Sequence, residues 1–179
     1  TVARNELGLR TLFNVLGPMA NPAGVTRQLI GVYDRALCRP VVEVLQRLGS
    51  EHVMVVHSDD GLDEISLAAP TQIAELINGE IREYTLQPEQ FGFEKTSMQS
   101  LLVDGVDASF SLLTDALAGK TDERSQAAAN LIALNAGAAL FVAGITGSIN
   151  AGVELANEKL ASGAGLEKLL QLAAMTQAF

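Results

Sequence analysis

The stretch QLIGVYDRALCRPVVEVLQRLGSEHVMVVH, residues 28–57, decides the fold of this 179-residue chain. The apolar run at 28–33 has the length of a β-strand, and residues 39–48 place valines and leucines at helical intervals before Gly49. The second run, 52–57, is apolar without alternation, which is typical of a parallel strand covered on both faces. Strand, helix and strand in this order predict a βαβ unit.

Further helices and a hairpin are predicted on both sides of this unit. A short helix over 6–15 should stop at Gly17-Pro18. Two short strands within 71–86 should flank an Asn78-Gly79 turn, although ELING (75–79) could equally end a helix. A short helix is expected near 98–102, and longer ones at 108–117, 122–142 (with Thr121 as N-cap), 149–162 and 166–176. The fold class is therefore α/β, with a largely parallel sheet flanked by helices and a helical C-terminal part.

Composition and charge exclude several classes of protein. Hydrophobic residues make up 48% of the chain, and the mean hydropathy is +0.24, so the sequence can bury one substantial core. The net charge of −9 is the wrong sign for neutralising a phosphate backbone, so no nucleic-acid partner is expected. The single cysteine, Cys38, fits a reducing cytoplasm and is expected to pack as a small apolar side chain. No apolar run reaches the roughly 18 to 20 residues that span a bilayer, so no membrane partner is expected.

The stretch HSDDGLDEIS, residues 57–66, gathers four carboxylates directly after the second predicted strand. In open α/β sheets, ligands bind outside the carboxyl ends of the strands, so the position of this charge suggests a site. The adjacent pair Asp63 and Glu64 supplies the hard oxygen ligands that Mg²⁺ prefers. From spacing alone, a solvated loop with an Asp-Gly turn is the simpler explanation of the same residues.

Other candidate residues carry weaker signals. His57 stands at a strand end as a general base or, more simply, as a hydrogen-bonded histidine, and His52 is expected at the surface. GSINAG (147–152) resembles a phosphate loop only loosely, because it lacks a lysine and follows no strand. Arg4, Arg10 and Arg27 are either solvated surface residues or partners for a carboxylate.

Four segments together resemble the anthranilate phosphoribosyltransferases: RNELGLRTLFNVLGPMANPAG (4–24), QLIGVY (28–33), VVHSDDGLDEIS (55–66) and FGFE (91–94). The resemblance covers nearly the whole chain and matches the C-terminal two thirds of that family. It implies a phosphoribosyltransferase-type α/β domain like that of the nucleoside phosphorylases. It also implies a reaction of tryptophan biosynthesis, in which the amine of anthranilate displaces pyrophosphate from phosphoribosyl pyrophosphate.

The resemblance assigns roles to individual residues. Asp63 and Glu64 match the family's acidic pair and would hold one of two Mg²⁺ ions, which makes metal binding the favoured interpretation. Arg4 matches the arginine that contacts anthranilate, where a guanidinium suits a carboxylate. Gly17 and Pro18 match the lining of the anthranilate entry. No catalytic side chain is implied, because the reaction is a displacement that depends on positioning and charge neutralisation.

The family's glycine-rich G-T-G-G-D loop, its K-H-G-N-R segment and its ribose-phosphate loop would precede this chain. The chain is therefore expected to be part of a longer enzyme, to need the N-terminal part for activity, and to be inactive alone. Residues 1–20 would be the last helices of a small α domain, through which the family forms homodimers, and 21–179 an incomplete large α/β domain. A pyrimidine nucleoside phosphorylase-like enzyme and a non-catalytic paralogue remain alternatives, and the upstream sequence would distinguish them.

Overall fold

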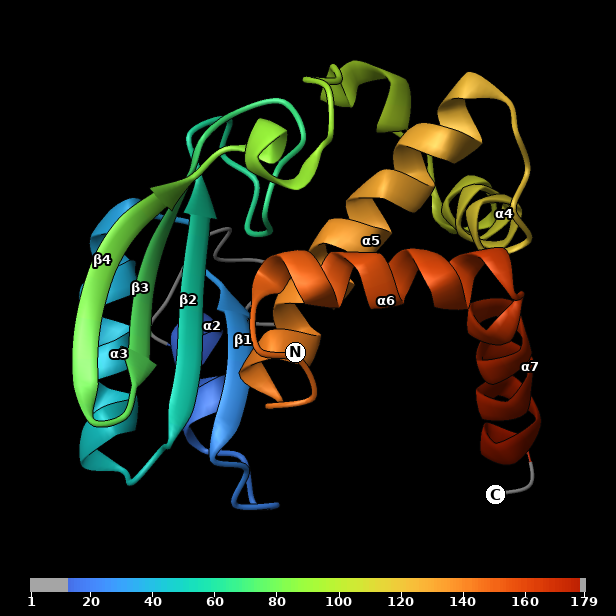
Figure 1. The fold of residues 1–179 in the computed structure, drawn as a ribbon. Helices are drawn as coiled ribbons and strands as arrows, with labels where there is room; N and C mark the ends of the chain where they lie inside the picture. Colours follow the sequence, from blue (N-terminus) through green and yellow to red (C-terminus); the bar gives the residue numbers. More distant parts are fainter. Residues whose placement is uncertain (1–12, 178–179) are drawn as a thin grey trace, which may run out of the picture.

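The computed structural model describes residues 13–177, which form a mixed sheet with helices on both of its faces (Figure 1). The four strands are β1 (Arg27–Gly31), β2 (His52–Ser58), β3 (Thr71–Ile77) and β4 (Glu80–Leu86). The α-helices are α2 (Phe13–Met19), α3 (Cys38–Arg47), α4 (Val106–Leu117), α5 (Glu123–Val142), α6 (Ile149–Ala161) and α7 (Ala164–Thr176). Three short 3₁₀ helices are η1 (Arg35–Leu37), η2 (Pro88–Phe91) and η3 (Met98–Leu101).

The sheet has the order β1-β2-β3-β4, and the prediction that it is largely parallel is wrong. Within residues 13–177, β1 and β2 are parallel, whereas β2–β3 and β3–β4 are antiparallel. The reason lies in the connections. A helix, α3, carries the chain back between β1 and β2, but residues 59–70 between β2 and β3 are a helix-free loop that reverses the chain direction. The hairpin predicted at Asn78-Gly79 joins β3 to β4, with both residues at positive φ.

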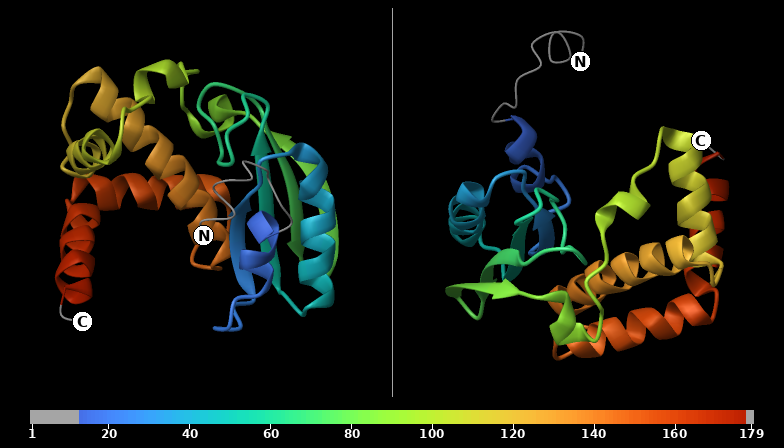
Figure 2. Two further views of the ribbon diagram at one scale, coloured as in Figure 1. Left: turned by 180° about the vertical axis from the view of Figure 1, so that it is seen from behind. Right: turned by 90° about the horizontal axis from the view of Figure 1, so that it is seen from above.

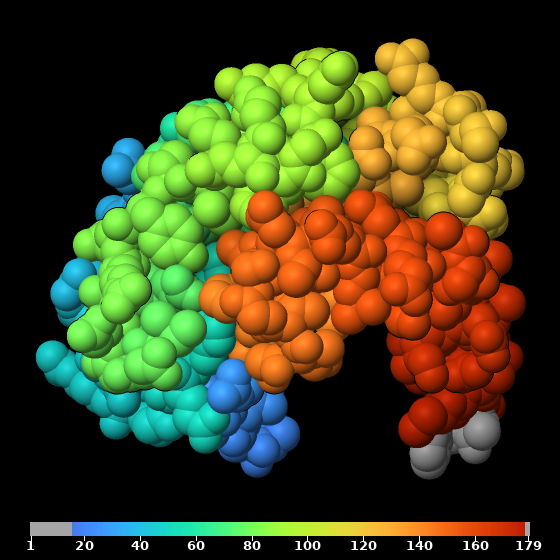
Figure 3. Space-filling model, viewed as in Figure 1, coloured from blue at the N-terminus to red at the C-terminus, as the bar shows by residue number. Residues whose placement is uncertain are grey.

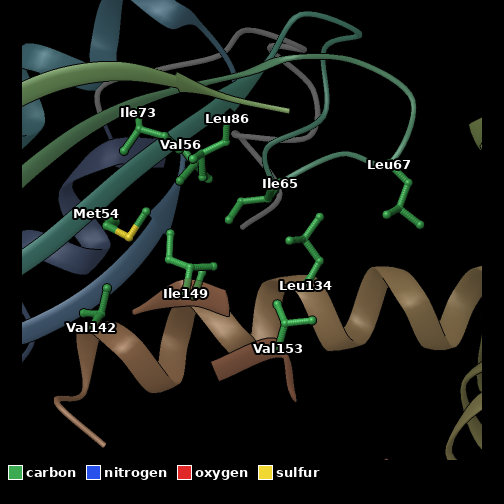
Figure 4. Close-up of a cluster of buried hydrophobic side chains, with 11 residues drawn as sticks. Met54, Val56, Ile65, Leu67, Ile73, Leu86, Leu134, Val142, Ile149 and Val153 are labelled. Atoms are coloured by element: carbon green, nitrogen blue, oxygen red, sulfur yellow. The ribbon is translucent and has the colours of Figure 1, made fainter. Parts of the chain in front are cut away.

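Strand β2 is covered on both faces, as its continuous apolar sequence predicted. Alternate side chains point to opposite faces of a strand. Val53 and Val55 pack with α3 residues such as Val42, while Met54 and Val56 face the other side. There they meet residues from α5, α6 and the loop after β2 (Figure 4), including Leu134, Val142, Ile149, Val153 and Ile65. The two layers of helices therefore sandwich the sheet, which Figure 2 shows from behind and from above.

Several predicted element boundaries shift by one or two residues. Helix α5 is capped by Asp122 rather than Thr121, because the Asp122 carboxylate accepts the Ser125 N–H at 3.0 Å. Helix α2 ends at Met19 with Pro18 inside its last turn, two residues beyond the predicted stop at Gly17. Pro18 has no backbone N–H to donate to the carbonyl four residues earlier, so the helix cannot continue far beyond it. Residues 6–12 of the predicted first helix lie outside the described residues.

Helix α5 is the central helix of the second layer. It is the one helix in residues 13–177 that is long and apolar enough to cross a membrane by length and composition. Its inner face is nevertheless packed, since Leu134 and Ala138 are fully buried. It crosses α6 at backbone contact, because a Cβ on Gly152 would lie 2.2 Å from the Gly137 carbonyl oxygen. These are features of a helix in the interior of a folded domain.

The outer parts of the molecule are less compact. The segment after β4 lies against α6, and an open notch separates α7 from the residues near the start of β1 (Figure 3). Large apolar side chains are exposed on α4 and α7, among them Val106, Phe110 and Met175.

Candidate metal-binding site

The acidic loop leaves the carboxyl end of β2, the edge of the sheet at which parallel β1 also ends. This loop returns across the end of β1 so closely that a Cβ on Gly31 would lie 1.6 Å from the Asp63 carbonyl oxygen. The side chains of Asp63 and Glu64 are exposed to solvent at the wall of a cavity of about 500 Å³. The position that the sequence predicted for this pair, at the mouth of the sheet, is the one observed.

Neither Asp63 nor Glu64 has a hydrogen-bond or ion-pair partner within residues 13–177. Partial burial in the cavity wall raises the pKa of Glu64, and the adjacent Asp63 carboxylate raises it further. Two adjacent carboxylates without a cation repel each other, which is an arrangement that a divalent metal would relieve.

The other two carboxylates of the loop are used differently. Asp60 accepts the Ser66 hydroxyl at 2.6 Å and the Leu62 N–H at 3.2 Å. Desolvation acts to raise the Asp60 pKa, but these hydrogen bonds outweigh it and the pKa is lowered. Asp59 is exposed and accepts a bond from Gln72 at 3.3 Å. Asp60 therefore organises the loop, while Asp63 and Glu64 are left available.

Asn135, which ties the loop to the helical layer, was not among the predicted site residues. Asn135 on α5 accepts the Ile65 N–H through Oδ1 and donates to the Ile65 carbonyl through Nδ2, both at 2.9 Å. Asn135 also lines the cavity, together with Gly31 and the acidic pair. The signal in the sequence was an amide side chain within the apolar, alanine-rich second half of this helix, but its partner lies 70 residues away.

The available carboxylates could supply only part of the coordination shell of a Mg²⁺ ion. Among residues 13–177 no group of three or more His, Cys, Asp or Glu side chains is placed to hold a metal. Mg²⁺ usually takes one or two carboxylates and completes its shell with waters and substrate phosphates. Two available carboxylates beside an open cavity match that requirement.

The two histidines are both engaged by other groups. His57 Nδ1 lies 2.8 Å from the Val32 carbonyl, which confirms the hydrogen-bonded alternative. The prediction that His52 is at the surface is wrong, because its side chain is only 5% exposed. Its Nε2 lies 2.8 Å from Glu75, which also accepts the Tyr84 hydroxyl at 2.9 Å. The sequence of β2 alone could not reveal that His52 is buried, because its partner Glu75 lies on β3 and Tyr84 lies on β4.

Among the described residues, the other predicted site residues Arg27, Gly17 and Pro18 are not brought to the acidic pair. Arg27 donates to the Val142 carbonyl at the end of α5 and pairs with Glu51, a structural use of its charge. Gly17 is exposed, and Pro18 lines a separate cavity of about 220 Å³ near the end of α3. Arg4 and Arg10 lie outside the described residues. At GSINAG, the Ser148 hydroxyl caps α6 by accepting the Ala151 N–H.

Comparison with known proteins supports the resemblance seen in the sequence. The anthranilate phosphoribosyltransferase of Stutzerimonas stutzeri (strain A1501) is 56% identical over 98% of this chain and 51% of its own length. The chain thus spans about half the length of this relative, rather than the expected two thirds.

Solved structures agree with the fold. The anthranilate phosphoribosyltransferase of Thermus thermophilus is 36% identical, with a TM-score of 0.82 over 97% of this chain and 50% of its own. The Saccharomyces cerevisiae enzyme in complex with PRPP and Mg is 25% identical, with a TM-score of 0.83 over 98% of this chain and 50% of its own. The family model described as glycosyl transferase family, a/b domain, matches residues 1–166. By this match over most of its length, the chain belongs to that glycosyl transferase family.

Proposed function

We propose that this chain supplies the metal-binding half of an anthranilate phosphoribosyltransferase. The enzyme would transfer the 5-phosphoribosyl group from phosphoribosyl pyrophosphate to the amine of anthranilate, giving N-(5-phosphoribosyl)anthranilate and pyrophosphate in tryptophan biosynthesis. The observation that carries the proposal is the unpartnered Asp63–Glu64 pair at the carboxyl end of β2, as far as the described residues extend. The 56% identity to a relative of that name supports it.

The roles proposed for individual residues follow from their chemistry. Asp63 and Glu64 would hold one of two Mg²⁺ ions that accompany phosphoribosyl pyrophosphate. Bound Mg²⁺ would neutralise the charge that develops on the departing pyrophosphate. Arg4 would bind the anthranilate carboxylate through its guanidinium, and Gly17 and Pro18 would line the entry for anthranilate. The yeast relative whose structure contains PRPP and Mg supports the choice of metal and substrate.

The proposal includes a second half of the enzyme. The relatives are about twice as long, and within the described residues β1 pairs only with β2, so its other edge is open to a further strand. We call this chain together with the upstream half found in its relatives the complete enzyme. It would contain the remaining pyrophosphate and ribose contacts, form a homodimer and act in the reducing cytoplasm. The acidic net charge supports the absence of a nucleic-acid partner.

The test is a turnover assay on the complete enzyme. Anthranilate fluorescence should fall when phosphoribosyl pyrophosphate and Mg²⁺ are added, with equimolar release of pyrophosphate, and this chain alone should give no signal. Turnover of a pyrimidine nucleoside with orthophosphate, and none of anthranilate, would instead identify a nucleoside phosphorylase. No turnover of either substrate pair would identify a non-catalytic paralogue.

A further inference from the structure

The backbone of the acidic loop is held by two anchors that are remote in sequence. From the helical side, the amide of Asn135 binds both polar backbone atoms of Ile65, the residue that directly follows Glu64. From the sheet side, the Asp63 carbonyl rests on Gly31, where no side chain fits. The acidic pair therefore lies between a hydrogen-bonded anchor and a steric one.

The orientation of the Asn135 amide is determined by its partners. Its Nδ2 donates to the Ile65 carbonyl and, at 3.1 Å, to the Leu131 carbonyl of the preceding helical turn. These two bonds use both N–H groups of the amide, so none remains for a ligand in the cavity. Its Oδ1 accepts the Ile65 N–H, so each hydrogen bond that the described structure gives this amide goes to the protein backbone, and two of the three hold the loop.

The carboxylates themselves depend on these anchors. No described side chain orients Asp63 or Glu64 directly, so their positions follow from the backbone that carries them. Ile65 is 1% exposed and packed in the core, so its burial also restrains the backbone next to Asp63 and Glu64. Metal sites depend on partners of this kind, and their loss typically weakens metal binding about 10- to 100-fold.

We propose that Asn135 is a positioning residue, which together with the bare backbone at Gly31 sets the geometry of Asp63 and Glu64 for a divalent cation. The proposal rests on the proposed function, since it assumes that this pair binds Mg²⁺. It assigns Asn135 no contact with either substrate. Its effect should therefore appear in metal affinity and in the Mg²⁺ requirement, and not in the affinity for anthranilate.

The test measures Mn²⁺ binding to the complete enzyme by electron paramagnetic resonance in the presence of inorganic pyrophosphate. Mn²⁺ takes the same oxygen ligands as Mg²⁺. Asn135→Ala should weaken Mn²⁺ binding about 10- to 100-fold and raise the KM for Mg²⁺, with the KM for anthranilate unchanged. The matched control is Asn130→Ala on the same helix. The Asn130 side chain makes no hydrogen bond in the described structure, so this variant should leave Mn²⁺ binding unchanged.

A second variant, Gly31→Ala, tests the same idea without changing α5. Its new Cβ must push the Asp63 carbonyl away by roughly 2 Å, so Mn²⁺ binding should weaken in the same way. It decides the matter if Asn135→Ala does not fold.

The controls distinguish failure of the metal assignment at Asp63 and Glu64 from failure of the positioning role of Asn135. If Asp63→Asn leaves Mn²⁺ binding unchanged, the metal assignment itself fails and the positioning role falls with it. If Asp63→Asn weakens binding but Asn135→Ala and Gly31→Ala behave like Asn130→Ala, only the positioning role is overturned. An equal loss of affinity for Mn²⁺ and anthranilate in Asn135→Ala would also overturn it, since that pattern reflects general distortion.

Discussion

Replacing both carboxylates of the acidic pair separates a functional from a structural role. In the complete enzyme, the double variant Asp63→Ala, Glu64→Ala removes two charges that have no partner within the described residues. It therefore breaks no hydrogen bond or ion pair of the described fold. It also relieves the mutual repulsion that contributes to the raised pKa of Glu64. We expect the apo protein to be as stable as the parent or slightly more stable.

The expected changes in Tm and in kcat distinguish a metal-binding role of the pair from a structural one. Exposed residues without special contacts usually change the free energy of unfolding by no more than about 0.5 kcal/mol, which corresponds to a Tm shift of about 2 °C or less. Had each carboxylate accepted a hydrogen bond in the fold, losing both would cost about 3 to 6 kcal/mol and lower Tm by more than about 5 °C. The loss of a group that stabilises developing charge costs about 100- to 1,000-fold in kcat.

The assay combines thermal unfolding without Mg²⁺ and anthranilate fluorescence with Mg²⁺. The expected result is an unchanged or slightly raised Tm with turnover reduced at least about 100-fold. Asp59→Asn is the control. The only described contact of the Asp59 side chain is an exposed hydrogen bond from Gln72, so this variant should change neither quantity. Asp60 is unsuitable as a control, since its hydrogen bonds organise the loop. A double variant that melts well below the parent and keeps its turnover would refute the metal assignment.

Three further outcomes are expected. Gly152→Ala should destabilise the complete enzyme by about 2 kcal/mol in chemical denaturation, because the clash with the Gly137 carbonyl exceeds the gain in helix propensity of about 1 kcal/mol. Gly165→Ala on α7, whose new Cβ meets only the ends of two leucine side chains, should be close to neutral. Burial and the neighbouring Glu75 carboxylate raise the pKa of Tyr84 above its ordinary value of 10, so above pH 10 the folded state retains a proton that the unfolded state loses. The free energy of unfolding should therefore decline as pH rises above 10. Tyr84→Phe should remove that decline, as measured by denaturant midpoints. Burial raises the pKa of the Cys38 thiol to about 11, so a disulfide reagent at neutral pH should modify it slowly in the native protein and rapidly in denaturant. Fast modification of the native protein would contradict the buried placement of this thiol.

Local sequence determined most elements of this fold. The βαβ unit, the Asn78-Gly79 hairpin and the four C-terminal helices follow from hydrophobic periodicity and turn residues, which act over a few positions. The location of Asp63 and Glu64 beyond a buried strand is local in the same sense. The family resemblance made the metal interpretation the favoured one, because spacing alone left a solvated loop as the simpler explanation.

The tertiary structure decided which elements and side chains meet. The direction of β3 depended on whether residues 59–70 contain a crossover helix, and their turn-rich, acidic sequence does not reveal how the chain returns. The burial of His52 depended on Glu75 from a neighbouring strand. The anchors of the acidic pair, Gly31 and Asn135, lie 32 and 70 residues from their partners. Contacts of this range leave no periodic trace in the sequence, because they are selected by how the sheet and α5 pack and not by local backbone preference.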